Sequence, residues 1–198
     1  MRAVAQEMDD HAVSSLVSMA GPQMGEFGVP GDSGWIVEFE SILTPEELEE
    51  IEHDASGFFY SKVGQLTSVG GYWNDPVHHD EFLQSSAFLP GYNGERDDAM
   101  ERRRANLLRV ENVYLFASSD DEIIAPPLSG LFQFYKYGET PTNETLVDME
   151  EMPGYDLTGL KQMVDEGRLQ RTDEPGLRHD DWRRNKQIFE KHILTKLT

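Results

Sequence analysis

ENVYLFASSDDEIIAP, residues 111–126, indicates the kind of sheet that this chain builds. Its apolar run, Val113 to Ala117, contains a β-branched residue and two aromatic residues, which favours a buried strand. Two serines end the run, and the carboxylates of Asp120 and Asp121 follow directly. In open α/β sheets, the chemistry collects just beyond the carboxyl ends of the strands. The stretch therefore predicts an α/β fold with a site where this strand ends.

A histidine later in the chain gives these acids a partner. His179 lies in the loop PGLRHDDW, before the last expected helix. An acid after one strand and a histidine after a later strand follow the order of Asp and His in a Ser–Asp–His triad on an α/β sheet. The alternative is that Asp120 and Asp121 only end the strand, because aspartate is common in turns.

The composition limits the classes of function. The chain has 198 residues, which suits one domain, 1–198, with a sizeable core. Its net charge of −20 argues against a nucleic-acid partner, which requires a basic surface, and against docking on anionic lipid. Without cysteine there is neither a disulfide nor a thiol nucleophile. No apolar run approaches the roughly 20 residues of a membrane span, and the first ten residues lack the apolar region of a signal peptide.

The first part of the chain predicts a helix, a strand and a loop. Residues 1–8 have partial helical spacing, and residues 13–20 form an apolar strand candidate. The Gly- and Pro-rich residues 21–34 contain GDSG, the core of a signature of chymotrypsin-like proteases. Those enzymes place both His and Asp before the serine, whereas only His11 precedes Ser33 here. We therefore expect a loop in which Ser33 is not a nucleophile.

Residues 35–105 lack the alternation of strands and predict a helical insertion over the sheet, a cap or lid. Residues 35–43 carry an amphipathic stripe, and TPEE at 44–47 has the features of a helix start. The apolar residues of this region suit either the enclosure of an acyl chain or an ordinary core. His78 and His79 do not predict a metal site, because neighbouring histidines rarely face one ion and no second cluster has zinc spacing.

The last part of the chain predicts two helices, one strand and a modification site. A helix is expected at 157–166, a polar last strand at 168–172 and a final helix at 182–197. Asn143 begins the sequon Asn-Glu-Thr. We expect Asn143 to be exposed on a loop, and to carry a glycan if the protein enters the secretory route.

Motifs spread along the whole chain resemble those of one enzyme family. They include PQMGEFG at 22–28, YWNDPVHHDEF at 72–82, SSDDEIIAP at 118–126 and GLRHDDWRRN at 176–185. In this order, and over nearly the whole chain, they resemble the palmitoyl-protein thioesterases. The stretch at 22–28 is most similar to the second, lysosomal type of that family.

The resemblance implies an α/β-hydrolase fold and a Ser–Asp–His triad. The family's acid lies where Asp121 stands and its base where His179 stands, so Asp120 would be only a neighbour. The implied activity is the hydrolysis of thioesters, which removes long-chain acyl (palmitoyl) groups from S-acylated proteins or acyl-CoA. The implied location is the lysosome, and the implied site needs no cofactor and no metal.

One departure from the family pattern concerns the nucleophile. The family's serine stands in a GYSQGG-like elbow a few residues before the arginine matched by Arg2, and no GxSxG motif occurs in this chain. We therefore expect the C-terminal portion of the fold, with the N-terminal strands and the serine missing. The strands at 13–20 and 113–117 would then border missing neighbours, and an open edge promotes aggregation. Such a chain would be inactive alone; the alternative is a remnant that serves as an acyl-binding or interaction protein.

Overall fold

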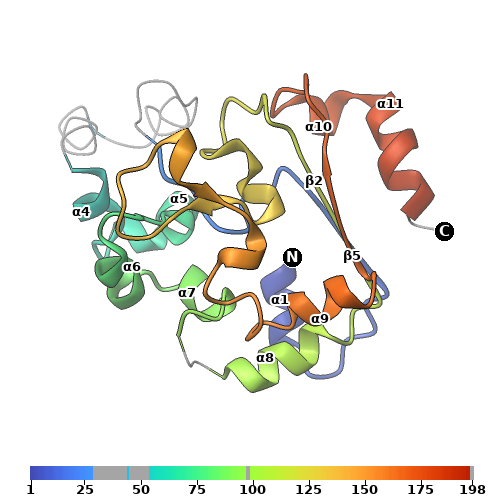
Figure 1. Ribbon diagram of the computed structural model, residues 1–198, viewed down its shortest axis with the longest axis horizontal. Coiled ribbons are helices and arrows are strands. Elements are labelled where there is room, and N and C mark those ends of the chain that lie inside the picture. The colour runs from blue at the N-terminus through green and yellow to red at the C-terminus, as the bar shows by residue number, and fades with distance from the viewer. Residues whose placement is uncertain (29–43, 45–53, 97–98, 197–198) are drawn as a thin grey trace.

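A parallel sheet lies at the centre of the computed structural model, which describes residues 1–28, 44, 54–96 and 99–196 (Figure 1). Its strands are β1 (Ser15–Met19), β2 (Asn112–Ala117) and β5 (Leu169–Asp173), in the order β1-β2-β5. Each was expected from the sequence within two residues at either end. A parallel sheet among helices is an α/β architecture.

The central position of β2 corrects one expectation. The sequence suggested that this strand borders a missing neighbour, but β2 pairs with β1 on one side and with β5 on the other. Its continuous apolar run fits this place, because a central parallel strand is buried on both faces. Among the described strands, β1 pairs only with β2, so the outer edge of β1 has no partner strand there.

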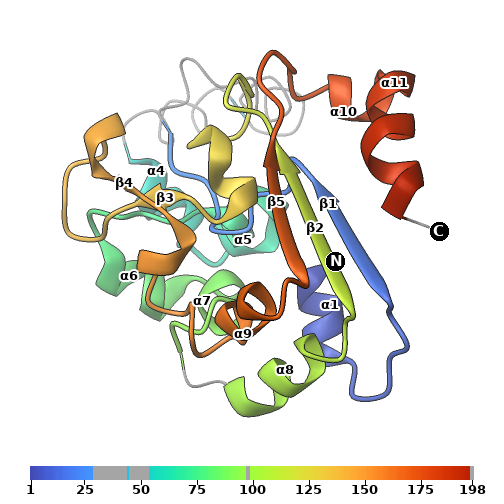
Figure 2. The same cartoon turned by 45° about the vertical axis from the view of Figure 1, so that its right-hand side comes forward.

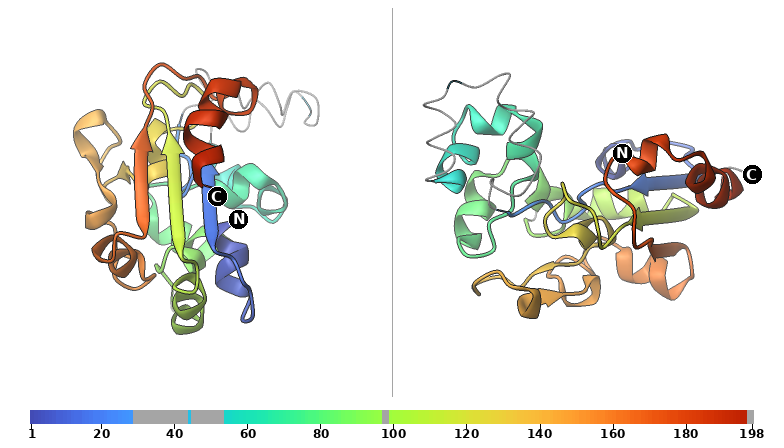
Figure 3. Two further views of the ribbon diagram at one scale, coloured as in Figure 1. Left: turned by 90° about the vertical axis from the view of Figure 1, so that its right-hand side faces the viewer. Right: turned by 90° about the horizontal axis from the view of Figure 1, so that it is seen from above.

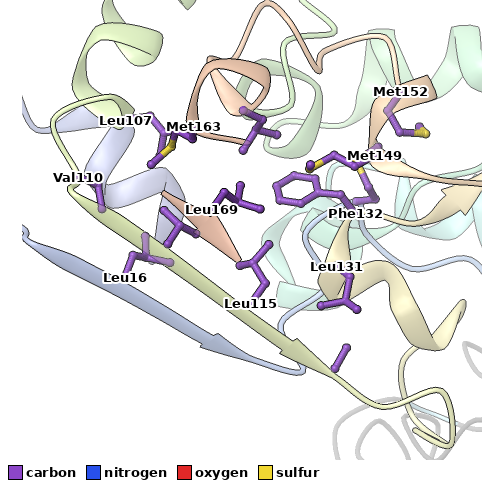
Figure 4. Packing of buried hydrophobic residues seen from close by; sticks show 14 of the residues in the cluster. Leu16, Leu107, Val110, Leu115, Leu131, Phe132, Met149, Met152, Met163 and Leu169 are labelled. Atoms are coloured by element: carbon purple, nitrogen blue, oxygen red, sulfur yellow. The ribbon is translucent and has the colours of Figure 1, made fainter. Parts of the chain in front are cut away.

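Helices cover both faces of the sheet. One face shares a core with α1 (Arg2–Glu7), α8 (Met100–Leu107) and α9 (Leu160–Asp165). The sheet contributes Leu16, Val113, Leu115 and Leu169 to this core (Figure 4). Phe116 points to the opposite face, where it joins Trp182, Ile188 and Ile193 of the C-terminal helices. Seen from above, the C-terminal helices and α9 lie on opposite sides of the sheet (Figure 3).

Helix α1 is held by the buried guanidinium of Arg2. This group donates hydrogen bonds to the carbonyl oxygen of Tyr92 at 2.8 Å, to Asn93 Oδ1 at 2.6 Å and to Gln23 Oε1 at 3.1 Å. Burial lowers the pKa of Arg2 to about 10, because the charged form loses water. Arg2 thus joins the start of α1 to the loop that follows β1.

A helical layer with its own core lies beside the sheet, at the left of Figure 1. It comprises α4 (Ala55–Phe59), η1 (Gly64–Leu66), α5 (Ser68–Tyr72), α6 (His79–Ser85) and α7 (Leu89–Tyr92). Its buried residues are Phe58, Phe59, Tyr60, Trp73, Phe82 and Leu89. Helix α8, inside the expected insertion at 35–105, instead packs on α1. The helices expected at 35–43 and 44–47 lie outside the described residues, apart from Thr44.

The final helix expected at 182–197 is interrupted (Figure 2). Helix α10 (Asp181–Arg184) stops at Asn185, which has the extended angles φ −90° and ψ 103°. The Asn185 side chain then accepts hydrogen bonds from the backbone of Gln187 and Ile188 and so begins α11 (Lys186–Ile188). A π-helical turn, η5 (Phe189–Ile193), and η6 (Leu194–Lys196) follow. Asparagine is among the preferred N-cap residues, which explains the break.

The remaining elements form a small antiparallel pair and several short turns. Strand β3 (Phe134–Tyr135) pairs with β4 (Leu146–Val147). The turns are η2 (Pro127–Leu131), η3 (Asn143–Thr145) and η4 (Met149–Glu151). Asn143 is exposed at the start of η3. In the described part of the chain, no helix has the length and apolar character needed to cross a membrane.

Candidate active site

The loops that follow β2 and β5 meet at the carboxyl edge of the sheet. The backbone N–H of Ser119, after β2, donates to Asp173 Oδ1 at the end of β5 over 2.9 Å. In return, the N–H of Glu174 donates to the carbonyl oxygen of Ala117 over 2.9 Å. Because neighbouring parallel strands end at the same edge, these contacts bring the residues beyond the two strands together.

Asp121 and His179 form a hydrogen-bonded pair at this edge. Oδ2 of Asp121 lies 2.9 Å from Nδ1 of His179, within the range expected from the sequence. The other carboxylate oxygen, Oδ1, accepts the backbone N–H groups of Ile123 at 2.9 Å and Ile124 at 3.0 Å. The Asp121 side chain is only 1% exposed. Its three partners hold the carboxylate in one orientation toward the imidazole.

The surroundings of His179 favour its protonated form. The hydrogen bond that the imidazole donates to Asp121 raises the pKa of His179, and the partial burial of the ring opposes this only in part. The negative charges of Asp121, Glu26 and Glu122 raise the pKa further. Since Nδ1 is engaged with Asp121, Nε2 is the nitrogen left to exchange a proton with another group.

A pocket of about 710 Å³ opens beside His179. Its apolar lining residues are Ala20, Pro22, Val69, Tyr72, Ile123 and Ile124. Its charged lining residues are Glu26, Glu122, Arg178, Asp180, Asp181, Arg183 and Arg184, and His179 and Ser68 complete the lining. The pocket therefore offers both apolar and polar contacts around one imidazole, which suits a substrate with one apolar part and one polar part.

The other candidate residues take different positions. Asp120 does not touch the imidazole; its Oδ2 accepts the backbone N–H of Gly176 over 2.7 Å. His78 and His79 each pair with one carboxylate, Asp75 or Glu95. In the parts of the chain that the structure describes, no three His, Asp or Glu side chains gather to hold a metal ion. Ser33 lies outside the described residues.

Glu122 is a site residue that the sequence reasoning missed. Its Oε2 accepts the backbone N–H of His179 over 3.1 Å, and its Oε1 accepts Nε of Arg178 over 2.9 Å. The signal was present as three consecutive acidic residues after a buried strand. Only the three-dimensional arrangement shows that the third of them reaches the loop of His179.

Known proteins resemble this chain over most of its length. A family model described as palmitoyl protein thioesterase matches residues 1–179, a span that includes Asp121 and His179. Lysosomal thioesterase PPT2 is 35% identical over 192 residues in Rattus norvegicus and 36% identical over 192 residues in Homo sapiens. Palmitoyl-protein thioesterase 1 of Caenorhabditis elegans is 30% identical over 178 residues.

These alignments cover most of this chain but a smaller share of each relative. The PPT2 alignments take in 96% of this chain but 59% of either relative, and the alignment to the worm protein takes in 89% of this chain and 56% of that protein. The chain therefore spans somewhat under two thirds of the length of the relatives that it matches.

Proposed function

Because the chain belongs to the palmitoyl protein thioesterase family, we propose that it carries the acid and the base of a hydrolase that cleaves long-chain acyl thioesters. Its substrates would be S-palmitoylated proteins or acyl-CoA. The observation that carries this proposal is the 2.9 Å contact between Asp121 and His179 on the wall of the pocket. The name of the relatives, lysosomal thioesterase, motivates a lysosomal location as part of the same proposal.

The proposed chemistry uses His179 as a proton carrier. Nε2 of His179 takes the proton of a serine hydroxyl as the oxygen attacks the thioester carbonyl, and Asp121 stabilises the imidazolium that forms. The C–S bond then breaks, the thiol leaves with the proton from His179, and the acyl group stays on the serine. A water molecule, deprotonated by His179, attacks the acyl-serine and releases the fatty acid.

We infer that the serine comes from a segment that precedes α1. The family resemblance places it shortly before Arg2, and these 198 residues contain no GxSxG motif. The geometry supports this position. A second pocket, of about 330 Å³, is lined by Met1, Arg2 and Ala3 and shares Pro22 and Tyr72 with the pocket of His179. The pocket beside the start of α1 therefore adjoins the pocket of His179.

The alternative is a non-catalytic protein that binds acyl groups, which the absence of GxSxG from these residues favours. The two proposals are separated by assaying palmitoyl-thioester hydrolysis with the 198-residue chain and with a longer form that carries a serine elbow before Arg2. Turnover by the longer form that is lost in both His179→Ala and Asp121→Ala would support the hydrolase. Acyl binding by the longer form without turnover would support the alternative. Full turnover by His179→Ala would refute the assigned base.

A further inference from the structure

Three consecutive acidic residues after β2 each hold a different point of the loop that carries His179. Asp120 Oδ2 accepts the N–H of Gly176 over 2.7 Å. Asp121 Oδ2 contacts the imidazole. Glu122 Oε2 accepts the N–H of His179 itself over 3.1 Å. Successive side chains of one short segment thus contact the start of the loop, the ring of the histidine and the backbone of the histidine.

Of the two outer acids, Asp120 and Glu122, it is Glu122 that contacts His179 itself. Asp121 fixes the ring, whereas Glu122 fixes the main chain from which the ring projects. Its second oxygen, Oε1, accepts Nε of Arg178, the preceding residue, over 2.9 Å. Hydrogen bonds to a carboxylate are among the stronger ones that a loop can make. His179 is thus held at two points, at its backbone by Glu122 and at its ring by Asp121. Holding both keeps a reacting group in place.

The loop has other restraints as well: Leu177 packs against the cluster of Phe116 and Trp182, and the carbonyl oxygen of Arg178 accepts the N–H of Asp181 at 3.0 Å. Gly176 has φ +88°, a conformation that favours glycine. The Arg178 side chain is 74% exposed. One further restraint comes from α10, where Asp181 Oδ2 accepts the N–H of Arg178 over 2.8 Å. Between Gly176 and His179, three backbone N–H groups donate to side chains, and the acceptors are the carboxylates of Asp120, Asp181 and Glu122.

We propose that Glu122 is a positioning residue for His179, and that Asp120 is a second anchor of the same loop. The importance of this role for turnover rests on the proposed function, in which His179 is the base. The anchoring itself does not, because it is a property of the folded loop. The charges that act on the imidazole are those of Asp121, Glu26, Glu122 and Asp180. The same pocket is also lined by four further charged residues, Arg178, Asp181, Arg183 and Arg184. Glu122 is thus one of several carboxylates that favour the imidazolium.

The anchoring is tested by amide hydrogen exchange of the purified protein. In Glu122→Ala, the N–H of His179 should exchange at least about tenfold faster, because a hydrogen bond to a charged acceptor is lost. The N–H of Gly176 should change little in Glu122→Ala but should exchange faster in Asp120→Ala. The matched control is Glu150→Ala, which removes an exposed glutamate paired with Arg171 at 2.5 Å. It should leave both amides at the wild-type rate.

The conservative variant separates the hydrogen bond from the charge. Glu122→Gln keeps a side-chain oxygen for the N–H of His179, so most of the exchange protection should remain. It removes a negative charge beside the ring, so the pKa of His179, followed by NMR of the imidazole, should fall. If Glu122 only supported the fold, Glu122→Gln would not keep the exchange protection that Glu122→Ala loses while also lowering the pKa of His179. Unchanged exchange at His179 in Glu122→Ala, or an unchanged His179 pKa in Glu122→Gln, would overturn the proposal.

Activity gives a separate outcome. In a form that hydrolyses thioesters, Glu122→Ala should lower kcat by about tenfold or more and leave KM nearly unchanged, because the base is misplaced while the pocket remains. If the wild type shows no turnover, the proposed function fails while the exchange and titration results still decide the positioning role. A wild-type kcat in Glu122→Ala, with exchange at His179 accelerated, would show that the anchor exists but does not position the base.

Discussion

Nδ1 of His78 lies 2.9 Å from Oδ2 of Asp75, the same separation that joins His179 to Asp121. In both pairs the aspartate side chain is nearly fully buried, but His78 is 64% exposed and lies in the helical layer. His179 lies at the carboxyl edge of the sheet and lines the large pocket. An Asp–His contact is therefore insufficient to identify a site, and its position in the fold separates the two pairs.

This contrast supplies a control for the catalytic assignment. In a form of the protein that hydrolyses palmitoyl thioesters, His179→Ala and Asp121→Asn should each lower kcat/KM by at least about a thousandfold, because the base or its orientation is lost. His78→Ala should leave kcat/KM near the wild-type value, since His78 lines a different pocket from that of His179. Equal losses in His78→Ala and His179→Ala would contradict the assignment.

The pH dependence of turnover should follow His179. The hydrogen bond that the imidazole donates to Asp121 raises the pKa of His179 above its usual 6.5, and a general base must be unprotonated to act. We expect kcat/KM to fall as the pH falls through this raised pKa. In Asp121→Asn the residual activity should persist to lower pH, because the main cause of the shift is gone. A profile with its midpoint below 6.5 in the wild type would contradict this account.

The strands were predicted from local patterns, whereas the pair of Asp121 and His179 was expected from the order of acid and histidine along the chain and from the family resemblance. The apolar run of β2 shows its burial, and the order of Asp121 and His179 along the chain follows the order of the strand ends. The central place of β2 was not predictable from its own residues, because strand order depends on contacts between distant segments. The break at Asn185 was missed because the apolar spacing continues through it.

The roles of the neighbouring acids also required the structure. Asp120, Asp121 and Glu122 are equivalent in sequence as acids after a strand, and they differ only in which part of the later loop they reach. Likewise, the sequence argued only against a metal site at His78 and His79. That each histidine faces its own buried carboxylate depends on how α4, α6 and α7 pack together.

The exposed Asn143 should accept a glycan when the chain passes through a secretory route. Its side chain is accessible at the start of η3, and Thr145 completes the sequon on the same turn. Expression in secretory cells should give a glycosidase-sensitive shift in mass that disappears in Asn143→Gln. Thr142→Ala, which leaves the sequon intact but removes the cap of the turn, serves as the control and should keep the shift.

The outer edge of β1 should promote self-association of the 198-residue chain. In the described part of the sheet this edge has no partner strand, and Met19 on it is 39% exposed. A charge on an edge strand opposes pairing with another chain. We therefore expect Met19→Lys to reduce the fraction of oligomers in sedimentation velocity. Leu157→Lys, on an exposed residue distant from β1 in sequence, should not. A monomeric wild type would show that the edge is protected.

The pair of Asp75 and His78 should make the stability of the helical layer depend on pH. The hydrogen bond that the His78 ring donates to Asp75 raises the pKa of His78 above 6.5. His78 therefore contributes stability that is fully present below 6.5 and is lost as the pH rises through its folded-state pKa. For Asp75, burial opposes ionisation, but hydrogen bonds from Ser56 and His78 outweigh it and lower the pKa below 3.8. Its contribution is present above 3.8 and is lost as the pH falls through the lowered pKa.

The contributions of His78 and Asp75 to stability are both present between about pH 4 and pH 6.5. The test therefore compares variants inside and outside this pH range. The free energy of unfolding of the wild type, measured with urea, should exceed that of His78→Gln by the largest amount within the window. This difference in the free energy of unfolding should shrink as the pH rises above the folded-state pKa of His78. The side chain at position 78 is then neutral in the wild type, as it is in His78→Gln at every pH. Lys136→Gln breaks the exposed pair of Lys136 and Glu139, which contains no histidine. Its difference from the wild type should stay constant between about pH 5.5 and pH 8, because histidine is the side chain whose ordinary pKa lies in this range. A His78→Gln difference that is equally constant would show that the contact with Asp75 does not depend on the charge of the imidazole.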